Sequence, residues 1–182
     1  MKIRGRIFTI SNFLSFSRII IVWPIAYYLM QNTAKGNMTA FILMLIGACT
    51  DFMDGYLARA LNQQSDLGRI IDPIADKVSL GLLGIILTQT SGLPVWFLIL
   101  IIARDLAILL LGLKMIAKQD SIPESNWSGK IAVTGIAVVV ILYTLGLSPW
   151  REAALWITVF LLLYSIVNYF RRYLAFLQAQ KI

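Results

Sequence analysis

The chain has 182 residues, of which 59% are hydrophobic and only 14% are charged. A soluble domain is usually about 45–50% apolar and about 25% charged, so the composition excludes an ordinary water-soluble enzyme, a disordered tail and a collagen-like fibre. The net charge of +7 does not indicate a nucleic-acid partner, because the Lys and Arg residues separate apolar runs instead of clustering on a polar face.

Residues 2–10 combine three basic residues with Ile and Phe ahead of the first apolar run. This pattern is typical of a short amphipathic helix at the membrane interface, and equally of a disordered basic tail. The apolar run that follows is expected to be a retained helix. Arg18 interrupts it and no clear cleavage site follows, which disfavours a cleaved signal peptide.

Six apolar stretches are long enough to cross a bilayer core, which takes roughly 20 helical residues. We therefore expect an all-α, polytopic membrane protein with six transmembrane helices, forming a single domain over residues 1–182. The connections are short and leave no room for a second soluble domain. The predicted spans are residues 13–31, 38–59, 70–91, 94–116, 130–147 and 152–174.

The Lys and Arg residues predict the orientation of these spans. They concentrate in the N-terminal segment, the second and fourth connections and the C-terminus, whereas the opposite side has only Lys35 and Arg151. By the positive-inside rule, both termini are expected in the cytoplasm. The protein is thus predicted to be integral to the inner or plasma membrane of the cell.

Aspartates are concentrated in residues 51–76, and four of them lie on predicted membrane helices. A charge at the bilayer centre costs about 2.5–3.5 kcal/mol on the lenient insertion scale, so four carboxylates there indicate a site; solvation at helix ends is the alternative. Asp51 and Asp54 are three residues apart and Asp72 and Asp76 are four apart, so each pair shares a helix face. A short loop joins the two helices, which places both pairs in the cytoplasmic half.

The chemistry of this window points to hard cations. The chain has no histidine, and its single cysteine, Cys49, lies outside the window. Oxygen-only ligation suits Mg²⁺ or Mn²⁺, and a pair of such ions would clamp a diphosphate. Gly55 and Gly68 would let a ligand or a neighbouring helix approach the backbone closely. Arg59 would bond phosphate oxygens or anchor its helix at headgroup level.

Residues 51–76 read DFMDGYLARALNQQSDLGRIIDPIAD. This stretch resembles the signature of the CDP-alcohol phosphotransferase family, D-x-x-D-G-x-x-A-R-x8-G-x-x-x-D-x-x-x-D. In the first span, Asn12, Ser15 and Arg18 resemble the family's P-N-x-x-S/T-x-x-R pattern, with Ser11 where proline is common. The resemblance covers essentially the whole chain. All fixed signature positions match: Asp51, Asp54, Gly55, Ala58, Arg59, Gly68, Asp72 and Asp76.

The resemblance implies that an alcohol displaces CMP from a CDP-linked substrate and receives its substituted phosphate. It implies two divalent ions held by Asp51, Asp54 and Asp72, with Asp76 contributing to the second ion and serving as the candidate base. It also implies a homodimer. The residues that the family pattern assigns to the CDP pocket are Asn12, Gly55, Ala58, Arg59 and Gly68.

Small members of the family often use CDP-diacylglycerol, with acceptors that include glycerol 3-phosphate, inositol phosphate, serine and phosphatidylglycerol. The stretches IIARDL and SGKIAVTG are similar to the corresponding regions of phosphatidylglycerophosphate synthases, which favours glycerol 3-phosphate. Arg104, Lys130 and Lys118 are the candidate cations for the acceptor's phosphate. An ion pair with Asp105 or another aspartate is the alternative role for Arg104, and a topology signal is the alternative for Lys118.

Other functions remain open from the sequence. Within the family, the acceptor would be inositol phosphate, or phosphatidylglycerol in a cardiolipin synthase. Intramembrane prenyltransferases also bind magnesium diphosphate through aspartates, but they are usually much longer and lack the glycine and Ala-Arg spacing. A cation transporter would have acidic residues and repeat symmetry in both halves, and the sequence shows no such repeat.

Overall fold

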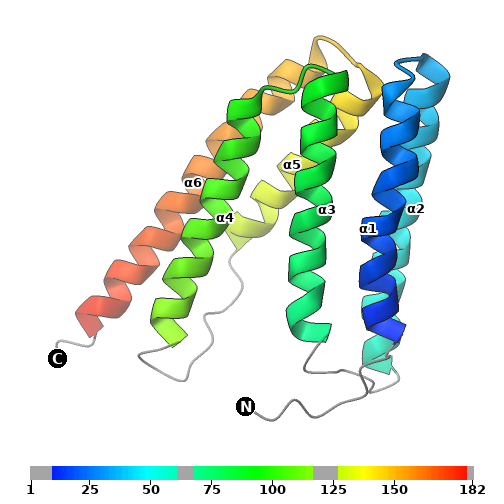
Figure 1. The fold of residues 1–182 in the computed structure, drawn as a ribbon. Coiled ribbons are helices and arrows are strands. Elements are labelled where there is room, and N and C mark those ends of the chain that lie inside the picture. The colour runs from blue at the N-terminus through cyan, green and yellow to red at the C-terminus, as the bar shows by residue number, and fades with distance from the viewer. Residues whose placement is uncertain (1–9, 61–67, 117–126, 180–182) are drawn as a thin grey trace. The chain divides into compact units, whose positions relative to one another are not determined.

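The computed structural model describes residues 10–60, 68–116 and 127–179, with side chains described for 19–50, 77–111 and 127–178 apart from Phe176. These residues form six helices and no strand, which confirms the predicted all-α class (Figure 1). Except for residue 10, the predicted interfacial segment 2–10 lies outside them. The helices are α1 (Ile10–Met30), α2 (Ala34–Ala60), α3 (Gly68–Thr90), α4 (Val95–Ile116), α5 (Trp127–Leu145) and α6 (Trp150–Ala179).

Among the described residues, two helices are long and apolar enough to cross a bilayer. They are α5, over Trp127–Leu145, and α6, over Trp150–Ala175. The apolar described segments of α1, α2 and α3 are shorter. They are Ile19–Met30, Ala34–Thr50 and Lys77–Thr90. The six predicted spans therefore coincide with six helices, while the number that cross a membrane stays a prediction.

The chain forms two compact units, Met1–Leu93 and Pro94–Ile182. In the first unit, α1 packs against both α2 and α3. Its buried side chains Val22, Ile25 and Leu29 recur every three or four residues, as expected for one packed face of a helix. Because α2 runs opposite to α1 and α3, the first turns of α1, the last turns of α2 and the first turns of α3 share one end (Figure 1).

In the second unit, α6 packs against both α4 and α5. Its buried face follows Leu155, Thr158, Leu162 and Ser165, again at helical spacing. This face is unusual for an apolar helix because two of its four members carry hydroxyls. Gly135 of α5 allows close packing here, since a Cβ at that position would lie 2.9 Å from Thr158 Oγ1.

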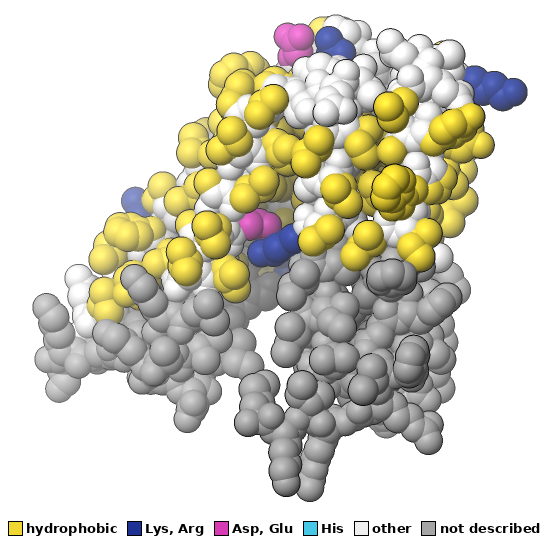
Figure 2. All heavy atoms as spheres, viewed as in Figure 1, with side chains coloured by type: hydrophobic (Ala, Val, Ile, Leu, Met, Phe, Trp, Pro, Cys, Tyr) yellow, Lys and Arg dark blue, Asp and Glu magenta, His cyan; other side chains and the backbone are white. Residues whose placement is uncertain are grey.

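Apolar side chains also cover much of the exposed surface of each unit. Trp23 of α1 is exposed, as are Trp156 and Phe160 of α6. On the face seen in Figure 2, hydrophobic side chains dominate the described surface and few charges interrupt them. Apolar patches of this extent indicate an interaction with lipid or protein instead of water. The chain was predicted to be one domain, and that remains a prediction.

Candidate functional site

The four signature aspartates lie on two helical segments of the first unit. Asp51 and Asp54 belong to α2, which ends at Ala60, and Asp72 and Asp76 belong to α3. Because both segments are helical, the spacings of three and four residues place each pair on one helix face. The side chains of these aspartates lie outside the described set, so their roles as ligands and base stay predictions.

The remaining motif segments lie at the same end of the first unit. Asn12 lies in the first turn of α1, and Gly68 is the first residue of α3. Gly55, Ala58 and Arg59 lie in the last turns of α2. These segments share one end of the first unit (Figure 1), so residues far apart in the sequence lie at the same end of the three helices.

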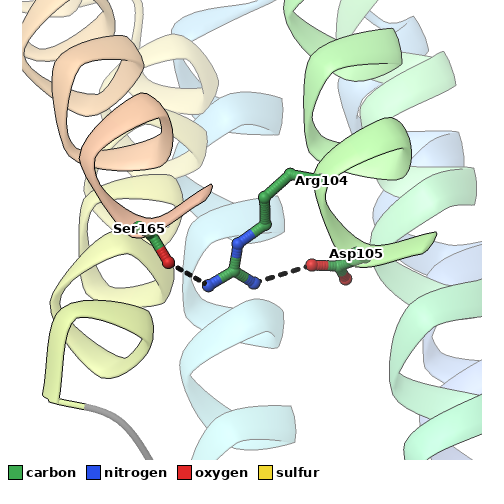
Figure 3. A network of polar contacts seen from close by, with 3 residues as sticks. All are labelled: Arg104, Asp105 and Ser165. Atoms are coloured by element: carbon green, nitrogen blue, oxygen red, sulfur yellow. Dashed lines mark hydrogen bonds and ion pairs between the residues drawn. The ribbon is translucent and has the colours of Figure 1, made fainter. Parts of the chain in front are cut away.

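In the second unit, Arg104 of α4 is a buried cation with only 6% of its surface exposed. Its Nη1 donates a hydrogen bond to Asp105 Oδ1 at 2.7 Å, and its Nη2 donates to Ser165 Oγ of α6 at 3.0 Å. Figure 3 shows the guanidinium reaching from α4 toward α6, between these two acceptors. The ion pair that the sequence offered as an alternative is therefore present. It offsets the cost of burying the charge.

A second polar contact joins α5 and α6, and Gly129 of α5 lies beside the guanidinium. Asn168 Nδ2 of α6 donates to Ser128 Oγ of α5 at 3.2 Å. A Cβ at Gly129 of α5 would lie 3.3 Å from Arg104 Nη2 and 3.2 Å from Tyr169 Oη. We call this group the polar cluster of the second unit. Its members are Arg104, Asp105, Ser128, Gly129, Ser165, Asn168 and Tyr169.

The sequence pattern does not single out the α6 members of the cluster. A usable signal was present: Ser165, Asn168 and Tyr169 are three or four residues apart or adjacent, so they share one side of an otherwise apolar helix. Polar side chains in such a position usually have partners on neighbouring helices. What the sequence does not reveal is that the partners are Arg104 and Ser128.

The other two predicted acceptor cations have different surroundings. Lys130 is exposed in the first turn of α5, with its Nζ 5.3 Å from the centroid of the Trp127 ring. Lys118 lies outside the described residues. Among the described side chains, no three acidic or cysteine residues gather into a metal-binding group, and the signature aspartates are not part of that set.

Residues 8–164 match the model of the CDP-alcohol phosphatidyltransferase family. The chain belongs to this family. The matched range includes α1 to α5 and the signature over residues 51–76, so membership rests on most of the chain and not on the motif alone. The protein is accordingly a transferase of phospholipid synthesis. Ser165 lies immediately beyond the matched range.

Several curated proteins are similar in sequence to this chain. Over 150 residues the chain is 32% identical to a CDP-diacylglycerol–glycerol-3-phosphate 3-phosphatidyltransferase of Bacillus subtilis, with 78% of this chain and 77% of that protein covered. It is 31% identical to a probable phosphatidylglycerophosphate synthase of Mycobacterium tuberculosis, with 91% and 80% covered. It is 35% identical over 121 residues to a probable cardiolipin synthase (CMP-forming) of Drosophila melanogaster, with 66% and 36% covered.

Proposed function

We propose that this protein is an integral-membrane phosphatidyltransferase that uses CDP-diacylglycerol and glycerol 3-phosphate. Its products are phosphatidylglycerophosphate and CMP. The observation that carries the proposal is the complete aspartate signature, which lies on the last turns of α2 and the first turns of α3. The names of the Bacillus and Mycobacterium relatives support the choice of substrates.

Two Mg²⁺ or Mn²⁺ ions belong to the proposal. Asp51, Asp54 and Asp72 would hold them, and Asp76 would contribute to the second ion. The donor set fits such ions because it offers carboxylate oxygens only, paired at helical spacing on α2 and α3. Bound ions supply charge neutralisation for the diphosphate and for the leaving group.

The reaction itself is a displacement at phosphorus. The acceptor's hydroxyl oxygen bonds to the phosphorus that carries diacylglycerol, the bond from that phosphorus to the bridging oxygen breaks, and CMP leaves. Asp76 would take the hydroxyl proton, since a carboxylate is the natural base in a chain without histidine. The CDP moiety would be bound by the motif residues Asn12, Gly55, Ala58, Arg59 and Gly68.

Arg104 would bind the phosphate of the acceptor. Two of the five N–H donors of its guanidinium serve Asp105 and Ser165, and its buried Nε has no partner among the described residues. The group therefore keeps donors for phosphate oxygens. Gly129 places the first turn of α5 beside Arg104 Nη2, and a helix N-terminus favours an anion. Lys130 and Lys118 are the other candidate cations for the acceptor's phosphate in this proposal.

The proposed arrangement in the membrane has six spans, both termini in the cytoplasm and an active site open to the cytoplasmic side. The positive-inside distribution of Lys and Arg supports this orientation. The exposed apolar side chains of both units support contact with lipid. A homodimer is part of the proposal on the basis of the family resemblance.

Phosphatidylglycerol is the second candidate acceptor, because of the similarity to the Drosophila cardiolipin synthase. Its phosphate is a diester with one negative charge, whereas glycerol 3-phosphate and inositol phosphate carry a phosphomonoester. A monoester offers more charge and more free oxygens to a guanidinium. The buried Arg104 therefore favours a phosphorylated small alcohol over phosphatidylglycerol.

The decisive experiment is an acceptor panel. Purified protein in mixed micelles receives CDP-diacylglycerol and Mg²⁺ or Mn²⁺, with glycerol 3-phosphate, inositol phosphate, serine or phosphatidylglycerol, and CMP release is measured. We expect release with glycerol 3-phosphate, and phosphatidylglycerophosphate as the lipid product. Release with another acceptor alone would overturn the choice of acceptor, and no release with any acceptor would overturn the proposed reaction.

A further inference from the structure

The guanidinium of Arg104 is held from its own helix and from a second one. Asp105 follows Arg104 directly on α4, so this hydrogen bond by itself joins two residues of one helix. Ser165 is different because it lies on α6, is fully buried and accepts from Nη2 at 3.0 Å. The two bonds engage two different nitrogens. Together they fix the plane of the group and the direction of the remaining donors.

Gly129, on a third helix, lies close to the guanidinium of Arg104. A Cβ at this position would lie 3.3 Å from Arg104 Nη2, which is closer than an ordinary van der Waals contact. The same Cβ would lie 3.2 Å from Tyr169 Oη, so space is short on both sides. A methyl group at position 129 would therefore require Arg104 Nη2, Tyr169 Oη or both to move by a few tenths of an ångström.

We infer that Ser165 and Gly129 are positioning residues for the acceptor's phosphate, acting through Arg104. Ser165 fixes the guanidinium by accepting from Nη2, and Gly129 leaves the room that this orientation needs. Neither residue has to touch the substrate. The inference rests on the proposed acceptor role of Arg104. It adds a residue, Ser165, that lies beyond the range matched to the family.

The test measures two Michaelis constants separately in the full-length protein. Ser165→Ala removes the accepting oxygen with little change in volume, and Gly129→Ala adds the crowding methyl. A hydrogen bond to a charged group contributes enough that its loss should raise KM for glycerol 3-phosphate about tenfold in each variant. The KM for CDP-diacylglycerol should stay within about twofold of the wild-type value, because its proposed pocket lies on other helices.

Two matched control variants distinguish an effect on the position of the Arg104 guanidinium from a general effect on helix packing. Thr158→Val removes a buried hydroxyl from the same face of α6, two turns before Ser165, without a change of shape. Gly135→Ala crowds the α5–α6 contact through Thr158, away from Arg104. Both controls should leave KM for glycerol 3-phosphate unchanged. If they raise it as much as the test variants do, the effect is general packing and the inference is overturned.

A double-mutant cycle decides whether Ser165 acts through Arg104. In an Arg104→Gln background, Ser165→Ala should have no further effect on KM, because the bond is already lost. Full additivity would overturn the inference. If Arg104→Gln alone leaves KM unchanged, the proposed acceptor role of Arg104 fails. If Arg104→Gln raises KM while Ser165→Ala does not, only the positioning inference fails. If Gly129→Ala does not fold, the result for Ser165→Ala decides the positioning inference.

Discussion

Ser165 Oγ on α6 accepts a hydrogen bond from Arg104 Nη2 on α4 at 3.0 Å, across 61 residues of sequence. This bond joins two helices at a charged group that is only 6% exposed. A buried cation of this kind needs compensation, and Asp105 provides it from the adjacent position. The ion pair therefore explains why the charge is tolerated, while the bond to Ser165 defines where the charge is held.

Neutralising the ion pair in two steps should separate stability from function. Arg104→Gln removes the cation that pairs with the Asp105 carboxylate, which costs toward the lower end of about 3–5 kcal/mol because Asp105 is 24% exposed. Adding Asp105→Asn should recover part of that loss, since it removes the charge that Arg104 no longer balances. Neither variant should use glycerol 3-phosphate efficiently, because both lack the cation.

Thermal unfolding in detergent and CMP release measure the two effects. The wild-type protein and the Asp105→Asn single variant are measured beside Arg104→Gln and the double variant, which completes a double-mutant cycle. A double variant that is less stable than Arg104→Gln would contradict the ion-pair argument. A double variant with wild-type KM for glycerol 3-phosphate would contradict the proposed role of the guanidinium.

The aspartate signature predicts a sharp dependence on metal. Asp72→Asn should lower CMP release by about a hundredfold or more, because metal-ion catalysis supplies several kcal/mol of charge stabilisation. Asp66→Asn is the matched control, since Asp66 lies in the same window but at no fixed position of the signature. Removal of divalent ions with EDTA should abolish activity, and Mg²⁺ or Mn²⁺ should restore it. Equal activity in Asp72→Asn and Asp66→Asn would argue against the proposed ligand set.

The sequence predicts the helices well and the polar contacts poorly. The predicted span 94–116 corresponds closely to α4 (Val95–Ile116), because an apolar run bounded by polar residues defines a membrane helix. The predicted end at residue 174 falls short of Ala179, since a helix need not stop where its apolar run stops. Asp105 was foreseeable as a partner of Arg104 because it is adjacent. Ser165 was not, because that contact depends on how α6 packs against α4.

The glycines of α5 and α3 should respond to alanine in opposite directions. At Gly135, a Cβ would lie 2.9 Å from Thr158 Oγ1, so Gly135→Ala overpacks the α5–α6 contact and should cost about 1–3 kcal/mol. At Gly81, inside α3, a Cβ would meet nothing within 4 Å. Gly81→Ala should therefore stabilise the helix by about 0.5–1 kcal/mol. Thermal unfolding of both variants in one detergent tests the pair. Shifts of the same sign would contradict the packing described for α5 and α6.

The start of α2 depends on Thr33, the residue that precedes its first helical position. Thr33 Oγ1 accepts a hydrogen bond from the backbone N–H of Gly36 at 3.0 Å, and the Thr33 carbonyl accepts from Asn37 N–H at 2.8 Å. This is the geometry of an N-cap, and its loss costs about 1 kcal/mol. In Thr33→Ala, the Gly36 amide should therefore exchange with solvent deuterium about fivefold faster, since each 1.36 kcal/mol is a factor of about ten.

Thr33→Ser keeps the accepting oxygen and should keep the wild-type exchange rate at Gly36. Thr39→Ala is the matched control on the same helix, because the Thr39 hydroxyl donates to the Lys35 carbonyl at 2.9 Å and caps no free amide. It should leave the Gly36 amide unchanged. Hydrogen exchange with mass-spectrometric readout over the peptide that contains residues 33–40 resolves the three variants. If Thr39→Ala accelerates exchange as much as Thr33→Ala does, α2 is not held at its start by the Thr33 side chain.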